Sequence, residues 1–402
     1  MIEKSIKLWL TSVKTSKGYN NHKCTSNPTL NIQHSHEVKK VNIALFLLLF
    51  PAILGLQSCT TQKPTVTLSN SLEQVQVSNA SQIQKQESSQ LFPIVQNGKW
   101  GYINSTGQII IKPQFDETGW FSEGLAAVKI ANKSGYINKA GQILIKPNFD
   151  SAYDFSEGLA AVDIGGKMGY VNKTGKLVIR PQFELTYRFS EGLAAVRIKL
   201  DQWGYIDKNG KMAILPQFNE ARDFSKGLAL VTIDERASYI NKTGQVLIKP
   251  PSNLVRKFSE GLAAVRIADK VGYIDTTGRM VIEPQFDEGY DFSEGLAVVA
   301  TGVISADSQP PDMSNVKWGY IDKTGQMVIE PQFKGRPVDF SEGLAAVRVG
   351  EKWGYIDKTG QMVIAPQFDW ASVFTEGLGW VMVGEKQGYI DKTGKYIWNP
   401  KN

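Results

Sequence analysis

The chain has 402 residues, 42% hydrophobic and 10% aromatic, which is ample apolar material for a core. Its formal charge of +6 is unevenly placed, because residues 1–58 hold seven lysines and two acidic residues. The rest of the chain is close to neutral. It lacks the basic surface that dominates nucleic-acid affinity, so nucleic acid is excluded as a partner.

An apolar run of 14 residues, Ile43–Leu56, follows two lysines and leads into Gln57-Ser58-Cys59. A positively charged flank, a short apolar segment and a small residue directly before a cysteine form the layout of an export signal. The stretch LQSC resembles the lipobox of bacterial lipoprotein signals. This resemblance implies cleavage after Ser58, diacylation of Cys59, and an outer-membrane or cell-surface location, since Thr60 is not the aspartate that retains lipoproteins at the inner membrane.

A plain signal anchor or a buried core helix is the alternative for this run, although a membrane-spanning helix needs about 20 residues. The sequence ahead of the run is longer than export signals usually have, which leaves open whether residues 1–38 are translated. Residues 59–90 are rich in Ser, Gln and Thr and have no aromatic residue, so we expect a flexible tether. The predicted layout is therefore a signal at 1–58, a tether at 59–90 and a folded domain at 91–402.

One unit repeats throughout residues 91–402. A Gly-Tyr step marks it, and successive steps are 34 or 35 residues apart except around an insertion at 301–315, where the interval is 13 residues longer. Such a period is typical of stacked repeat arrays. The steps begin at Gly101, Gly135, Gly169, Gly204, Gly272, Gly319, Gly354 and Gly388, with Ser238 filling the one gap.

The tetrapeptide Asp322-Lys323-Thr324-Gly325 also carries the phosphorylated aspartate of P-type ATPases. Here the first position is asparagine in four of nine copies, and asparagine cannot accept a phosphoryl group in that way. The tetrapeptide instead predicts a β-hairpin on a type I turn. In that turn Asp322 hydrogen-bonds the backbone and Gly325 has a positive φ.

Each unit is predicted to contain three antiparallel strands, with LAAV, WGYID and QMVI as their sequences in one copy. The third strand is expected to end at the following proline, which cannot donate to a ladder. A glutamate before the first strand recurs in unit after unit, which indicates a turn or solvent-facing residue. Its copies are Glu123, Glu157, Glu191, Glu260, Glu294, Glu342 and Glu376.

One such meander cannot bury enough apolar surface to offset the cost of ordering it, so neighbouring units must pack together. The predicted fold is all-β, a tandem array of about nine three-stranded antiparallel meanders with a period of 34 residues. The array is expected to curve. The sequence leaves open whether it forms a superhelix or a propeller-like ring.

The joint pattern WGYIDKTGxxVIxPQF followed by FSEGLAAV resembles the WG repeat, a bacterial family named after the Trp-Gly seen at Trp100, Trp203, Trp318 and Trp353. The resemblance implies a β-rich repeat scaffold, often in envelope or secreted proteins, with no catalytic residues to carry over. The Trp position departs from the family pattern in five units, at Ser134, Met168, Ala237, Val271 and Gln387.

The residues after the predicted cleavage site offer few side chains for nucleophilic catalysis or metal binding. The three histidines and Cys24 precede that site, which removes Ser-His and Cys-His arrangements and typical zinc sites. We expect no catalytic residue, no metal and no cofactor. A pair of carboxylates acting as a glycan hydrolase is the enzymatic alternative, and its weakness is that the glutamates repeat.

Candidate binding residues lie two positions before the Phe of FSEG, where Tyr and Arg recur, both favoured at recognition surfaces. The alternative is that these side chains cover the edge of the adjacent unit. Three tryptophans outside the Trp-Gly position could stack on sugar rings or pack in the core. The candidates are Tyr153, Tyr187, Arg222, Arg256 and Tyr290 in the column, and Trp120, Trp370 and Trp380 outside it.

The sequence therefore favours a non-catalytic, lipid-anchored envelope scaffold that binds another protein over an extended β surface. The second hypothesis is a glycan- or peptidoglycan-binding module. A hydrolase comes third.

Overall fold

The computed structural model describes residues 90–252, 254–302 and 316–399. The predicted lipidation site Cys59, the signal, nearly all of the tether and most of the 301–315 insertion lie outside these residues. The described residues form nine antiparallel sheets, here called blades 1 to 9 in chain order. Six blades have a fourth strand ahead of the predicted three, which has two residues in blades 2 to 5 and six residues in blades 7 and 9.

The strands of blades 1 to 5 are β1 (Phe92–Gln96), β2 (Lys99–Ile103) and β3 (Ile109–Phe115); β4 (Glu117–Thr118), β5 (Leu125–Ile130), β6 (Lys133–Asn138) and β7 (Ile143–Phe149); β8 (Ser151–Ala152), β9 (Leu159–Ile164), β10 (Lys167–Asn172) and β11 (Leu177–Phe183); β12 (Leu185–Thr186), β13 (Ala194–Lys199), β14 (Gln202–Ile206) and β15 (Met212–Phe218); β16 (Glu220–Ala221), β17 (Ala229–Ile233), β18 (Arg236–Ile240) and β19 (Val246–Ile248).

The strands of blades 6 to 9 are β20 (Leu262–Ile267), β21 (Lys270–Asp275) and β22 (Met280–Phe286); β23 (Glu288–Ser293), β24 (Leu296–Thr301), β25 (Lys317–Ile321) and β26 (Met327–Phe333); β27 (Leu344–Val349), β28 (Lys352–Asp357) and β29 (Met362–Phe368); β30 (Trp370–Thr375), β31 (Leu378–Val383), β32 (Lys386–Ile390) and β33 (Tyr396–Trp398).

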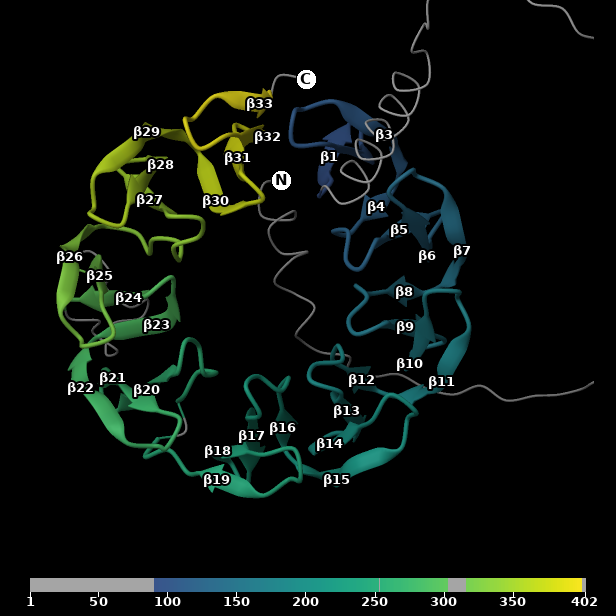
Figure 1. The fold of residues 1–402 in the computed structure, drawn as a ribbon, viewed down its shortest axis with the longest axis horizontal. Coiled ribbons are helices and arrows are strands. Elements are labelled where there is room, and N and C mark those ends of the chain that lie inside the picture. Colours follow the sequence, from purple (N-terminus) through teal and green to yellow (C-terminus); the bar gives the residue numbers. More distant parts are fainter. Residues whose placement is uncertain (1–89, 253, 303–315, 400–402) are drawn as a thin grey trace, which may run out of the picture. The chain divides into compact units, whose positions relative to one another are not determined.

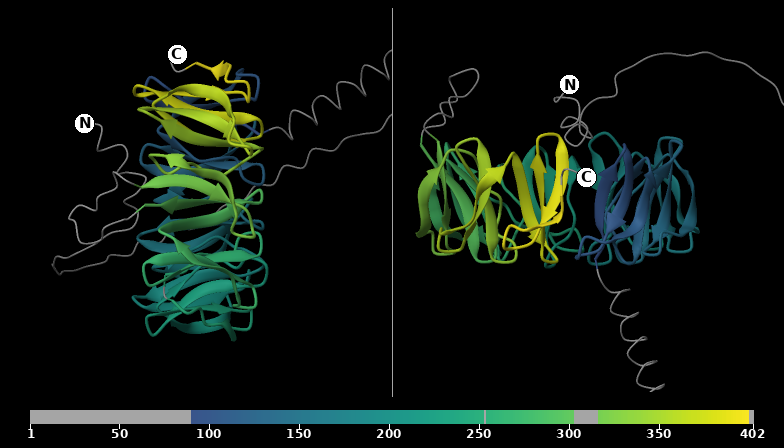
Figure 2. Two further views of the ribbon diagram at one scale, coloured as in Figure 1. Left: turned by 90° about the vertical axis from the view of Figure 1, so that its left-hand side faces the viewer. Right: turned by 90° about the horizontal axis from the view of Figure 1, so that it is seen from above.

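The blades stand side by side in a closed ring, with the first strand of each four-stranded blade nearest the middle and the last strand at the outside (Figure 1). Seen from the edge, the strands run along the ring axis (Figure 2). Of the two predicted architectures, the ring is confirmed and the superhelix is not.

The core lies between blades. In the LAAV strand of blade 3, Leu159 and Ala161 face blade 4 whereas Ala160 and Val162 face blade 2, as the period of two requires. Each interface between neighbouring blades has one buried cluster, and nine clusters serve nine interfaces. The ninth joins blade 9 to blade 1, where Phe92 packs against Tyr389 with ring centroids 5.4 Å apart.

The predicted hairpin is confirmed. In blade 7 the Asp322 carboxylate accepts hydrogen bonds from the Thr324 and Gln326 N–H groups at 2.8 and 3.0 Å. Gly325 has a φ of 88°. It also packs on the preceding blade, because a Cβ at this position would approach the Ile282 side chain to 2.8 Å. The tetrapeptide therefore closes its own hairpin and covers its neighbour.

The prediction that the third strand ends at its proline is wrong. Pro331 lies inside β26, and Phe333 beyond it pairs with Trp318. A register shift, which is a β-bulge, separates this pair from the pairing of Tyr320 with Ile329. The bulge places proline where the ladder needs no N–H donor, so pairing resumes after it.

The glycine of Trp-Gly leaves the space that this bulge needs. A Cβ at Gly319 would collide with the Ile329 carbonyl oxygen and lie within 3.0 Å of the Pro331 nitrogen. The same collision recurs at the equivalent glycine of the other blades that have a proline in this bulge, for example Gly101 and Gly354. Glycine is therefore required by the close approach of two backbones.

The tyrosine after this glycine fastens each blade to the next. Tyr320 is fully buried, and its hydroxyl donates to the Val338 carbonyl at the inner side of blade 8 at 2.9 Å. Equivalent bonds begin at Tyr136, Tyr170, Tyr205, Tyr239, Tyr273 and Tyr355. At the ring closure, Tyr389 donates to the Pro93 carbonyl of blade 1 at 2.9 Å.

Candidate binding surface

The column predicted from the sequence lies along the inner side of the ring, and its backbone is held identically from blade to blade. The N–H of Tyr187 donates to the Ala195 carbonyl at 2.9 Å, and that of Arg222 donates to the Leu230 carbonyl at 3.0 Å. Their carbonyls accept from the buried tyrosines of the preceding blades. Because only the backbone is used in these bonds, the side chains are free to differ between blades.

Two groups of column side chains meet across blade boundaries. Arg222 of blade 5 donates to the Tyr187 hydroxyl of blade 4 at 3.1 Å. The guanidinium of Arg256 of blade 6 lies 4.1 Å from the ring centroid of Tyr290 of blade 7. Arg336 of blade 8 lies 3.6 Å from the same ring. These contacts join blades 4 and 5, and blades 6, 7 and 8, into two polar and aromatic strips.

The sequence did not single out Arg336. The signal that could have found it is the segment between Phe333 and Phe340, which is one residue longer than the matching segment of its neighbours. That extra residue places an arginine against Tyr290 and shifts the column position to Val338.

Carboxylates lie directly beside this column. Burial raises the pKa of Asp223, Asp291 and Asp339, and nearby arginines or lysines offset part of the effect. Asp223 and Asp291 each keep one buried carboxylate oxygen without a hydrogen-bond partner among the described residues, whereas the Asp339 Oδ1 atom lies 3.5 Å from a guanidinium nitrogen of Arg336. Guanidinium donors and buried carboxylate acceptors therefore lie side by side along the strips.

The remaining candidates are placed apart from these strips. Tyr153 of blade 3 is 52% exposed and Trp120 of blade 2 is 41% exposed. Trp370 of blade 9 is 47% exposed and lies 5.1 Å from the Trp353 ring centroid. Trp380 is partly buried against the cluster that closes the ring, so it serves packing. Trp120 and Trp370 keep exposed faces that a ligand could contact.

The recurring glutamate is neither a plain turn residue nor a free surface residue. Glu191 of blade 4 has a φ of 54°, and its carboxylate accepts the Gly227 N–H of blade 5 at 3.0 Å. It also pairs with Lys242, from the hairpin of blade 5, at 3.0 Å. We call this three-residue contact the clasp. Equivalent ion pairs begin at Glu123, Glu157, Glu260, Glu294 and Glu342.

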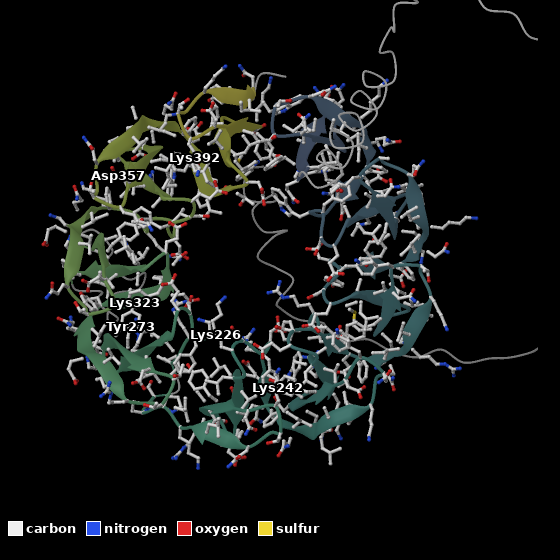
Figure 3. All side chains as sticks on the ribbon, in the orientation of Figure 1. Lys226, Lys242, Tyr273, Lys323, Asp357 and Lys392 are labelled. Atoms are coloured by element: carbon white, nitrogen blue, oxygen red, sulfur yellow. The ribbon has the colours of Figure 1, made fainter. Side chains whose placement is uncertain are left out.

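The clasp changes at the boundary between blades 5 and 6. Lys226 occupies the glutamate position, and Thr276 occupies the lysine position opposite it. These two residues cannot form the ion pair. Figure 3 shows Lys226 at the inner rim of blade 5, whereas Lys323 and Lys392 belong to complete clasps. The paired departure in the sequence was the signal that could have revealed the clasp.

Restoring this clasp is expected to stabilise the ring. Lys226→Glu combined with Thr276→Lys should raise the free energy of unfolding by about 1–2 kcal/mol, typical of a charge-assisted hydrogen bond. Thr276→Lys alone should destabilise, because it sets two ammonium groups against each other. Denaturant unfolding of the four members of this double-mutant cycle measures the coupling, and a coupling near zero would contradict the clasp.

The coupling should also depend on pH. Burial raises the pKa of Glu191, but bonds from Lys242 and the Gly227 N–H outweigh it and leave the pKa below its ordinary value of 4.5. Between the lowered pKa and 4.5, the folded chain binds fewer protons than the unfolded chain. The ionised clasp therefore adds its full contribution to the free energy of unfolding above pH 4.5. That contribution is lost as the pH falls through the lowered pKa of the folded chain. Repeating the double-mutant cycle at pH 7 and pH 3.5 tests this, because the coupling energy of the restored clasp should be smaller at pH 3.5.

Two further findings concern the described residues alone. Within them, no helix is long and apolar enough to cross a membrane. No group of three or more His, Cys, Asp or Glu side chains in that part of the chain could hold a metal ion.

A closed ring of nine repeated blades defines a repeat β-propeller protein. The family model described as "WG containing repeat" matches residues 100–133, 135–167, 168–199, 203–236, 238–270, 272–302, 318–353 and 353–386. The chain belongs to this family.

Among solved structures, "Crystal structure of the eukaryotic initiation factor" is similar with a TM-score of 0.56 and 14% identity, covering 77% of this chain and 94% of that one. BamB from Moraxella catarrhalis has a TM-score of 0.39 and 11% identity, covering 70% of this chain and 97% of that one. AztD from Citrobacter koseri has a TM-score of 0.37 and 12% identity, over 68% and 93%. At these identities the likeness of the first structure concerns the fold alone. No curated protein matches the chain.

Proposed function

We propose that this protein is a non-catalytic scaffold that binds another protein along the inner side of the ring. The observation that carries the proposal is the pair of strips formed by Tyr187 with Arg222, and by Arg256, Tyr290 and Arg336. Tyrosine and arginine, together with tryptophan, are the side chains enriched at protein-binding hot spots. Here contacts between blades hold them in place, which lowers the entropy lost when a partner binds.

The clasps support a non-catalytic role for the recurring glutamates. A glycosidase acid needs a raised pKa, so that it is protonated near neutral pH. In Glu157, Glu260 and Glu294 burial raises the pKa, but the lysine and glycine donors outweigh it and lower the pKa overall. These carboxylates are therefore suited to joining blades.

The partner proposal is tested with two matched double variants. Arg222→Gln with Arg256→Gln removes two charges from the strips, and Arg180→Gln with Arg279→Gln removes two charges at exposed positions outside the strips. We expect the first to weaken capture of a discrete protein from solubilised envelope tenfold or more, because each hot-spot residue contributes about 1–2 kcal/mol. The second should capture as the parent does. An equal loss of partner capture in both double variants would mean that only net charge matters, and this would contradict the proposal.

The second candidate function is glycan binding, favoured by the exposed faces of Trp120 and Trp370. Aromatic faces of this kind can stack on sugar rings. Retention on insoluble peptidoglycan that is lost in Trp120→Ala with Trp370→Ala, but kept in the arginine double variant, would favour this function over the first.

We further propose that the scaffold is exported and anchored through lipid on Cys59, on the strength of the LQSC stretch. Cys59→Ala is expected to move the protein from the membrane fraction to the soluble fraction, because a plain signal anchor would not need this thiol. Cell fractionation with immunoblotting measures the shift. Continued membrane retention of the variant would instead favour the signal anchor.

A further inference from the structure

A cavity of about 250 Å³ lies between blades 2 and 3. Its walls are the inner strand β4 with Gly119 beside it, the middle of β5, Ser134 of β6, and Ala152–Asp154 of blade 3. Tyr153 at its border is half exposed, and the Glu117 side chain, which pairs with Lys129, is 68% exposed. The cavity is therefore bordered by solvent-exposed residues.

Two other blades show aromatic rings that fill this space. In blade 4, the Tyr187 ring is stacked on the Trp203 ring, with centroids 5.4 Å apart and planes 17° apart. In blade 7, the Tyr290 and Trp318 rings meet with centroids 5.9 Å apart. Gly119 and Ser134 occupy these two positions in blade 2. Blade 2 thus lacks both rings of the pair, and the cavity lies where they would be.

Blade 5 provides a contrast within the same molecule. Ala237 replaces the tryptophan there, but the column position holds the long side chain of Arg222. The corresponding cavity, lined by both residues, is about 140 Å³. A small residue at the tryptophan position therefore leaves a space, and that space is larger when the column residue is glycine.

The cavity of blade 2 offers an acceptor as well as room. A Cβ built at Gly119 would lie 3.2 Å from the Asp154 Oδ1 atom, so this carboxylate faces the empty column position. Burial raises the Asp154 pKa, and Arg188 offsets part of that effect. A ring that carries an N–H or O–H group can donate to this carboxylate while its face covers the methyl group of Ala127.

We propose that this cavity binds the side chain of a tryptophan or tyrosine supplied by a protein partner, which replaces the ring pair that blade 2 lacks. The proposal rests on the protein-binding function argued above and names the chemistry that one part of the surface recognises. The size is suitable, because an apolar cavity of about 150 Å³ in another protein holds benzene. An indole ring is larger than benzene and is smaller than this cavity.

Filling the cavity from within tests the proposal. Ser134→Trp gives blade 2 the residue that blades 1, 4, 7 and 8 already have, and Ala237→Trp does the same in blade 5. The probe is N-acetyl-tryptophanamide, observed by saturation-transfer NMR on the full chain, with N-acetyl-leucinamide as the probe without a ring. We expect the tryptophan probe to bind the parent and Ala237→Trp alike, and to bind Ser134→Trp at least tenfold more weakly. On the parent and on Ala237→Trp, it should bind better than the leucine probe.

Equal binding of the tryptophan probe to Ser134→Trp and the parent would overturn the proposal. So would equal binding of the two probes, or preference for a soluble N-acetylglucosamine disaccharide that Ser134→Trp abolishes. If Ser134→Trp fails to fold, Ser134→Met replaces it, since Met168 occupies the same position in blade 3.

Failure of this site and failure of the proposed function give different results. If Ser134→Trp keeps partner capture while the arginine double variant loses it, the scaffold function stands and the cavity is not part of it. If probe binding follows the proposal but no arginine variant affects capture, the cavity stands as a ring-binding site and the strips do not bind the partner.

Discussion

Gly319→Ala is expected to lower the free energy of unfolding by about 3 kcal/mol, at the upper end of typical overpacking effects. The added methyl group would meet the Ile329 carbonyl oxygen and the backbone around Pro331. These are backbone atoms of the neighbouring strand, so no side-chain rotation relieves the contact. Relief requires β25 and β26 to separate, which breaks the pairing of Trp318 with Phe333.

Gly335→Ala is the matched control for this prediction. A Cβ there would lie 3.6 Å from the nearest atom of the Arg348 side chain, an ordinary contact, and the φ of Gly335 is not positive. We expect a change within about 0.5 kcal/mol. Urea unfolding followed by circular dichroism compares the two variants. Similar midpoints for both would mean that the bulge is not a rigid obstacle.

Phe92→Ala is expected to cost about 3–5 kcal/mol and to open the ring before the blades unfold. Phe92 is fully buried in the cluster that joins blade 1 to blade 9, between the rings of Tyr389 and Trp120. Along the described chain every other pair of neighbouring blades is also joined covalently. This interface has no covalent link, so loss of the fully buried Phe92 ring acts on the closure directly.

Phe218→Ala provides the comparison. Phe218 is equally buried, at 1% exposure, but its cluster joins blades 4 and 5, which are consecutive in the chain. We expect a similar loss of stability with no early opening. Hydrogen exchange should show early loss of protection in blades 1 and 9 for Phe92→Ala only, and X-ray scattering should show an increased radius at the same denaturant concentration. Simultaneous opening in both variants would argue that the ring unfolds as one cooperative unit.

The parts of the fold that depend on neighbours in sequence were predictable. The hairpin at Asp322–Gly325 follows from a turn aspartate and a glycine with positive φ, which are properties of four consecutive residues. The three-stranded unit follows from its alternating apolar pattern. The sequence did not decide between a ring and a superhelix, because closure depends on the angle between blades. Side-chain packing between blades, such as that of Phe92 on Tyr389, determines this angle.

The error at Pro331 has a physical cause. Proline was expected to stop the ladder, but the bulge leaves its nitrogen with no bond to make, and only Gly319 leaves room for that arrangement. Gly319 and Pro331 lie on different strands, so their dependence on each other is visible only when the pairing of those strands is known.

The candidate site was predicted in part. Tyr187, Arg222, Arg256 and Tyr290 were selected from their position in the repeat, and the structure brings them together in two strips. Arg336 was missed because it lies in a segment one residue longer than its counterparts. The glutamate clasp was missed because its partners come from the next repeat, although the joint change at Lys226 and Thr276 contained that information.

The clasp also has a consequence for how such a chain changes over generations. Each complete blade carries the glutamate acceptor for one neighbour and the lysine and glycine donors for the other, so adding or removing such a blade leaves complete clasps where it adjoins other complete blades. The stretches at residues 317–333 and 352–368 differ by one substitution, a similarity that gives recombination between gene segments a ready template. The angle between neighbouring blades then limits how many such units a closed ring can contain.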